Sequence, residues 1–129
     1  MQAATQTTAI TRVLRLEAAA AFAVAVVFYQ LNSFGWWLFA ICFLLPDLSM
    51  LGYLAGPRTG ALAYNTVHSY VGPLLLGLVA AFADTAIGMA VATIWFAHIS
   101  FDRVLGYGLK EASGFHSTHL GAIGRRGAA

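Results

Sequence analysis

Four residues of the sequence combine metal-ligand chemistry with positions in long apolar runs. They are two aspartates and two histidines, namely Asp47, His68, His98 and Asp102. Neutral imidazole nitrogens and carboxylate oxygens are donors that bind zinc, manganese and iron in proteins. An ionisable side chain in an apolar transmembrane run is costly unless it is paired or ligated. We therefore take these four residues as the candidate metal ligands.

Their distances from the ends of the apolar runs predict that they meet at one depth. Counting ~1.5 Å per helical residue from one membrane face places Asp47 and His68 roughly 12 and 10 Å inside, and His98 about 7 Å inside. Asp102 lies at the interface, four residues after His98, so the two share a helix face. Three helices would thus bring polar groups into the same half of the membrane.

Two further histidines, His116 and His119, follow in the polar tail on the same side of the membrane. They are the candidate catalytic residues, which would close the site from the tail or act as general acid and base. All four histidines of the chain fall in this region.

A structural interpretation of the same residues is also open, since the spacings match no specific zinc signature. In that interpretation the buried groups only make hydrogen bonds between helices. The carboxylates would then have nearby partners, which are Arg58 or Tyr53 for Asp47 and Arg103 or Lys110 for Asp102.

The composition indicates what must position these residues. Of the 129 residues, 60% are hydrophobic and only 9% are charged, which is far from the range of soluble domains. Each apolar run is near the ~20 residues that cross a bilayer as a helix. We predict an all-α fold, a single domain (1–129) forming an integral membrane bundle of four transmembrane helices, with a kink at Pro73. The expected helices cover 13–31, 36–55, 60–82 and 85–105, followed by a tail at 106–129.

The basic residues predict the orientation. All seven fall on one side of a four-pass topology: Arg12, Arg15, Arg58, Arg103, Lys110, Arg125 and Arg126. By the positive-inside rule that side is the cytoplasm, so both termini are expected there. We expect membrane lipids as partners, with a homo-oligomer or a larger membrane complex as further options, and no nucleic acid.

Four segments together resemble a known family. They are 46–53 (PDLSMLGY) with Gly56-Pro57-Arg58, then Tyr64-Asn65 with His68-Ser69-Tyr70, then 98–110, and finally 114–121. This combination resembles the domain-of-unknown-function 4260 family of small bacterial four-helix membrane proteins, over roughly residues 12–124. The resemblance implies a multi-pass protein of the bacterial inner membrane, and it implies no activity.

A second resemblance concerns the order Pro46-Asp47, His68-Ser69 and His98 with Asp102. This order is similar to that of membrane-bound metal-dependent hydrolases. Those proteins usually carry another acidic residue after the first aspartate, where this chain has Leu48 and Ser49. That departure argues against a site with two metals.

The leading hypothesis is therefore a metal-dependent hydrolase-like membrane protein that uses zinc, manganese or iron. One alternative is an oligomeric proton or ion transporter or channel, because intramembrane Asp and His residues form relays. Another is a haem-binding protein that uses His68 and His98 as axial ligands, or a partner subunit of a membrane complex.

Overall fold

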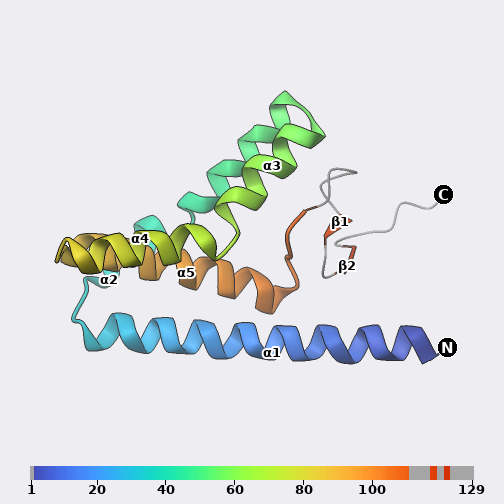
Figure 1. Ribbon diagram of the computed structural model, residues 1–129, viewed down its shortest axis with the longest axis horizontal. Coiled ribbons are helices and arrows are strands. Elements are labelled where there is room, and N and C mark those ends of the chain that lie inside the picture. The colour runs from blue at the N-terminus through green and yellow to red at the C-terminus, as the bar shows by residue number, and fades with distance from the viewer. Residues whose placement is uncertain (1, 111–116, 119–120, 123–129) are drawn as a thin grey trace.

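The computed structural model describes residues 2–110, 117–118 and 121–122, with side chains for 7–110. The chain is predominantly helical, as Figure 1 shows. Its elements in chain order are α1 (Gln2–Leu31), α2 (Trp36–Cys42), the 3₁₀ helix η1 (Leu45–Ala55), α3 (Pro57–Val67), α4 (Val71–Phe82), α5 (Ala86–Leu105) and an antiparallel pair of short strands, β1 (Ser117–Thr118) and β2 (Gly121–Ala122). The first helix thus begins earlier than residue 13, where we expected it.

Helix α5 lies at the centre of the molecule, and both α1 and α4 pack against it. α1 runs antiparallel to α5, so that its N-terminal half lies beside the C-terminal end of α5 (Figure 1). There Arg15 Nε donates a hydrogen bond to the Val104 carbonyl at 2.8 Å. The buried hydrophobic residues of α1 and α5 are mostly alanines, including Ala18, Ala90 and Ala97. Small residues let membrane helices approach closely, which is why such interfaces favour them.

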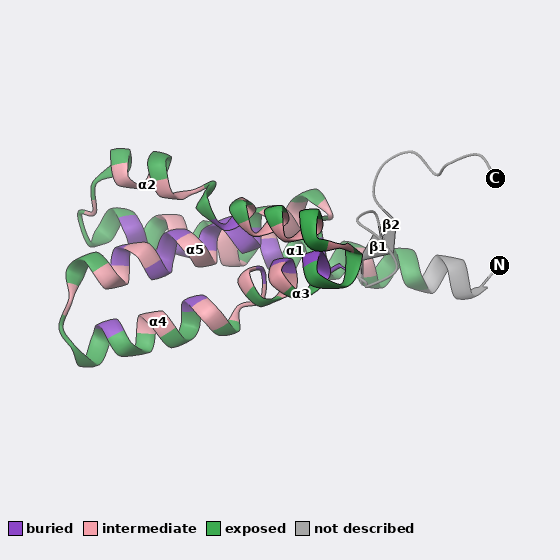
Figure 2. Cartoon of the chain, turned by 90° about the horizontal axis from the view of Figure 1, so that it is seen from above, coloured by how far each residue is buried: buried purple, intermediate pink, exposed green. Residues whose placement is uncertain are grey.

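Many of the large apolar side chains face outward instead. Residues such as Leu31, Trp37 and Phe82 are more than two-thirds exposed, and Figure 2 shows burial concentrated along α5 while the outer faces of α1 and α4 are exposed. Soluble monomers rarely expose contiguous apolar surface on this scale. Two stretches, Trp36–Ala55 and Pro57–Phe82, are long and apolar enough to cross a membrane.

The predicted helix over 36–55 is wrong as a single α-helix, because α2 ends at Cys42 and the chain continues as η1. Pro46 accounts for the break. It has no N–H to donate to the carbonyl four residues earlier, which is that of Cys42, and its ring clashes with that carbonyl.

η1 gives one face of the chain a strict threefold repeat. A 3₁₀ helix has three residues per turn, so side chains three apart eclipse one another. The aligned side chains are leucines that are 52–88% exposed, namely Leu45, Leu48, Leu51 and Leu54. We call this set the leucine stripe.

The predicted helix over 60–82 is also divided, into α3 and α4, with a break at 68–70. We expected a kink at Pro73, and the break lies one turn earlier. Pro73 has no N–H to donate to the carbonyl of Ser69, which lies in the break. α5 satisfies the neighbouring carbonyls: Trp95 Nε1 donates to Val67 at 2.7 Å and Arg103 Nη2 to His68 at 2.9 Å. Hydrogen bonds of this kind satisfy buried carbonyl groups that a helix break frees.

η1 and α3 pack side by side as a hairpin that leaves the layer of α1, α4 and α5 at an angle (Figure 1). Glycines allow the close approach. A Cβ at Gly60 would overlap the Tyr53 ring, and one at Gly52 would lie 2.9 Å from Ala63 Cβ. The structure therefore divides two of the four helices that we expected, 36–55 and 60–82, each into two elements.

Candidate metal centre

Helix α5 carries two of the predicted ligands on one face. His98 and Asp102 are four residues apart, which places them one above the other along a helix. His98 is 1% exposed, and its Nε2 lies 3.3 Å from Asp102 Oδ2. The helix thereby presents an imidazole and a carboxylate to the same point.

The two helix breaks supply the other two ligands. Asp47 lies in the first turn of η1, directly after the break that Pro46 causes, and His68 is the C-cap residue of α3. His68 is 2% exposed, whereas the Asp47 side chain is 41% exposed. Both breaks thus face the polar side of α5 at the same level.

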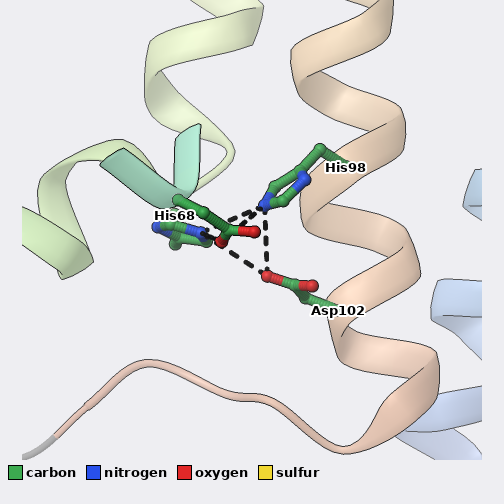
Figure 3. A group of neighbouring side chains, drawn as sticks. His68, His98 and Asp102 are labelled. Atoms are coloured by element: carbon green, nitrogen blue, oxygen red, sulfur yellow. Dashed lines mark hydrogen bonds and ion pairs between the residues drawn. The ribbon is translucent and has the colours of Figure 1, made fainter. Parts of the chain in front are cut away.

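The four ligand atoms converge at spacings that suit one ion. The His68 and His98 Nε2 atoms are 3.2 Å apart, and each lies 3.3 Å from Asp47 Oδ1. Asp102 Oδ2 is 3.3 Å from His98 Nε2 and 3.5 Å from His68 Nε2, and all four atoms lie within 4.8 Å of one another. A tetrahedral ion with bonds of ~2.0–2.2 Å separates its ligand atoms by roughly 3.3–3.6 Å. Figure 3 shows His68, His98 and Asp102 directed toward one another.

The surroundings of His68 select the tautomer that a metal needs. Its Nδ1 lies 3.0 Å from the Tyr64 carbonyl, and a carbonyl only accepts hydrogen bonds. Nδ1 therefore carries the proton, and the neutral ring directs the lone pair of Nε2 at the cluster. A ligand histidine is commonly oriented by such a bond from its other nitrogen.

His98 is positioned by packing instead. The Phe43 and His98 rings meet edge to face, with centroids 5.3 Å apart. Among the described residues, His98 Nδ1 is buried and has no hydrogen-bond partner. A buried imidazole with one nitrogen in apolar surroundings depends on its Nε2 side for polar contacts, and that side faces His68, Asp47 and Asp102.

Tyr64 and the segment after α5 also contribute to the site, although we did not count them among the candidate ligands. The Tyr64 ring stacks on the His68 ring, with centroids 3.8 Å apart and planes 8° apart. Lys110 Nζ lies 4.7 Å from the centroid of the Tyr64 ring. The signal in the sequence was the pair Tyr64-Asn65, one helical turn before His68.

The chain returns to the site because α5 ends abruptly. Gly106 has φ of 94°, and the Gly106 and Tyr107 N–H groups donate to the Arg103 and Asp102 carbonyls at 3.1 and 2.8 Å. This is the Schellman arrangement that a glycine permits at a helix end. Asn65 then binds the backbone of Lys110 through two hydrogen bonds. The Asn65 Nδ2 donates to the Lys110 carbonyl at 2.7 Å, and the Asn65 Oδ1 accepts from the Lys110 N–H at 2.6 Å.

Lys110 is buried, with 4% of its surface exposed. Burial lowers the pKa of its ammonium group, while the Asp102 and Asp47 carboxylates act in the opposite direction. The tail histidines His116 and His119 lie outside the described residues, so their expected roles stay predictions.

A comparison with known protein families places the chain in one of them. The family described as a domain of unknown function (DUF4260) matches residues 11–123. No curated protein and no solved structure matches the chain.

Proposed function

The chain belongs to the DUF4260 family, and we propose that it is a membrane-bound hydrolase that depends on one divalent metal ion. The observation that carries this proposal is the convergence of two imidazole nitrogens and two carboxylate oxygens within 4.8 Å of one another. The five nitrogen–nitrogen and nitrogen–oxygen separations among them are 3.2–3.5 Å. The four residues come from three separate elements, and two of those elements are broken at the level of the cluster.

The ion is zinc, manganese or iron, held by Asp47, His68, His98 and Asp102. These metals accept imidazole and carboxylate together, and each can bind more than four ligands. A water molecule that enters beside the exposed Asp47 carboxylate would be the nucleophile, since a bound metal lowers the pKa of water to near neutrality. His116 or His119 would act from the tail as general acid or base.

We place the site in the cytoplasmic half of the bacterial inner membrane, in a chain that crosses the membrane four times with both termini inside. The basic residues on one side of this topology support the orientation. The outward-facing large apolar residues support lipid contact on all sides of the bundle. A site at this depth is reached from the membrane, which favours a lipid-linked substrate.

A transport function is the second candidate, and the broken helices favour it. Discontinuous helices hold the ion and substrate sites of many transporters. Beyond the cluster, however, Tyr29, Ala90 and Ile94 pack together as a hydrophobic core, and the buried Thr93 hydroxyl donates to the Met89 carbonyl of its own helix. That packing offers no polar path onward, so we place hydrolysis first.

Haem binding receives no support from the geometry. Two axial nitrogens on opposite sides of one ion would be about 4 Å apart, twice a metal–nitrogen bond of ~2.0 Å. The two Nε2 atoms are 3.2 Å apart, and the carboxylates point to the same place.

Metal content measured by mass spectrometry on detergent-purified protein tests the proposal. We expect about one zinc, manganese or iron ion per chain, lost in Asp47→Asn and in His98→Gln. Asp84→Asn is the matched control, because it makes the same chemical change far from the cluster and asparagine tolerates the positive φ of 50° at that position.

Wild-type protein that holds no metal after expression in metal-rich medium, while both site variants remain folded, would overturn the proposal. Proteoliposome uptake of protons or divalent ions that is abolished in Asp47→Asn would then move transport to first place.

A further inference from the structure

A cavity of about 260 Å³ adjoins the metal centre. It is lined by Asp47, Met50, Tyr64, Asp102, Tyr107 and Lys110. The two carboxylates of the cluster thus face the cavity, whereas His68 and His98 are almost fully buried. A molecule in the cavity would therefore approach a bound ion from the carboxylate side.

The size of the cavity limits what it can hold. It is smaller than the ~300–1,000 Å³ of pockets for drug-sized ligands, and several times the ~30 Å³ that one water occupies. It suits a headgroup-sized moiety with a few waters rather than an acyl chain. A larger cavity of about 450 Å³ lies between α1, α5 and the break at 68–70, and it contains none of the four cluster residues.

Lys110 brings a fixed positive charge to this cavity. Asn65 binds its backbone through two hydrogen bonds, and its ammonium group lies over the face of the Tyr64 ring. That ring is itself stacked on His68. Contacts through Tyr64 therefore hold the Lys110 ammonium group in a set position relative to His68, one of the proposed metal ligands.

The charges of the site favour an anion once a metal is bound. Two carboxylates and one divalent ion sum to zero, and the imidazole ligands are neutral. Lys110 then leaves the cavity with a net positive charge in surroundings of low dielectric constant, where an ammonium group is strongly attracted to an anion.

We propose that this cavity binds the phosphate group of a phosphate monoester, with one oxygen on the metal and another on the Lys110 ammonium group. This inference rests on the proposed function and names the substrate class of the same site. Hydrolysis would form a bond from a water oxygen to phosphorus and break the bond from phosphorus to the alcohol oxygen. A proton of the water would pass to the departing alcohol, which leaves inorganic phosphate as the second product.

The test uses full-length, metal-loaded protein in nanodiscs and two probes, inorganic phosphate and dihexanoyl phosphatidic acid. Binding of each probe is measured by calorimetry, and metal content is measured on the same samples. We expect Lys110→Met and Lys110→Gln to lower phosphate affinity about tenfold or more, the size of a lost charge-assisted contact, with metal content unchanged. Arg58→Met, which removes an exposed charge at the tip of the hairpin, is the control and should bind like the wild type.

The two probes identify the source of the phosphate group. Tighter binding of phosphatidic acid assigns the site to a lipid headgroup, and equal binding assigns it to a soluble phosphate ester; both results support the proposal. Metal retained with unchanged phosphate affinity in both Lys110 variants would overturn this inference alone. Absence of metal from the wild type would overturn the proposed function and this inference together.

Discussion

At the residue scale, the two histidines and two aspartates of the cluster direct nitrogen and oxygen lone pairs toward one point. Tyr64 fixes the tautomer of His68 through a backbone carbonyl, and the helical spacing of four places His98 beside Asp102. Without an ion, two Nε2 atoms 3.2 Å apart must share a proton to avoid repulsion between their lone pairs. A metal ion or a proton therefore satisfies the same atoms, and the two compete.

This competition predicts how metal affinity depends on pH. Each imidazole must be unprotonated to bind a metal, so metal affinity should rise with pH and fall as the solution is acidified. With two imidazole ligands, the slope should reach up to about two log units per pH unit. Competition with a fluorescent chelator of known affinity measures it.

Repeating the titration with His98→Gln separates the two histidines. With only one imidazole ligand left, the limiting slope of metal affinity against pH should fall to half of the wild-type value. A metal affinity that does not change with pH in the wild type would mean that the imidazoles are not ligands.

At the scale of elements, the two proline-associated breaks create the site. An unbroken helix over 36–55 or 60–82 would continue past the cluster without turning toward α5. The breaks instead let Asp47 and His68 meet α5 at one level, and the η1–α3 hairpin fixes their mutual distance through the contact of Gly60 with Tyr53. The geometry of the hairpin should therefore control metal binding.

Gly60→Ala tests that link. The new methyl group would overlap the Tyr53 ring and force η1 away from α3, and overpacking of this kind costs about 1–3 kcal/mol. We expect a lower thermal midpoint in detergent together with weaker metal binding, because Asp47 moves with η1.

Gly77→Ala in α4 is the matched control, since its Cβ would have Ala92 Cβ as nearest neighbour at 3.7 Å, an ordinary contact. This variant should keep its stability and its metal. If Gly60→Ala loses stability while metal affinity stays unchanged, the hairpin does not position the ligand.

At the scale of the whole molecule, the distribution of side chains is inverted relative to a soluble protein. Alanines fill the contacts between helices, and large apolar side chains, including the leucine stripe of η1, cover the outside. α1 begins and α5 ends at the same end of the molecule (Figure 1). This arrangement agrees with an even number of membrane crossings and with the proposed orientation.

Cysteine labelling in intact cells tests that orientation. In a Cys42→Ser background, Ala83→Cys in the exposed turn between α4 and α5 should react with a membrane-impermeant maleimide added from outside. Arg58→Cys at the tip of the hairpin should react only after the membrane is permeabilised. The reverse pattern would place the metal centre in the outer half of the membrane.

The sequence by itself determined the helical class, the family and the four residues of the cluster. It could do so because the cost of burying ionisable groups leaves few of them in apolar runs, and each one is therefore conspicuous. The i,i+4 relation of His98 and Asp102 also follows from helical geometry alone. The expected roles of His116 and His119 stay predictions.

The tertiary structure decided where the helices break and what surrounds the cluster. A proline shows that a helix is disturbed, but which neighbour donates hydrogen bonds to the freed carbonyl groups depends on packing. Here Trp95 and Arg103 of α5 are the donors. The approach of Lys110 depends on contacts 45 residues apart in the chain, between its backbone and Asn65. No local pattern encodes such a contact, because it exists only when the end of α5 and the α3 helix are already in place.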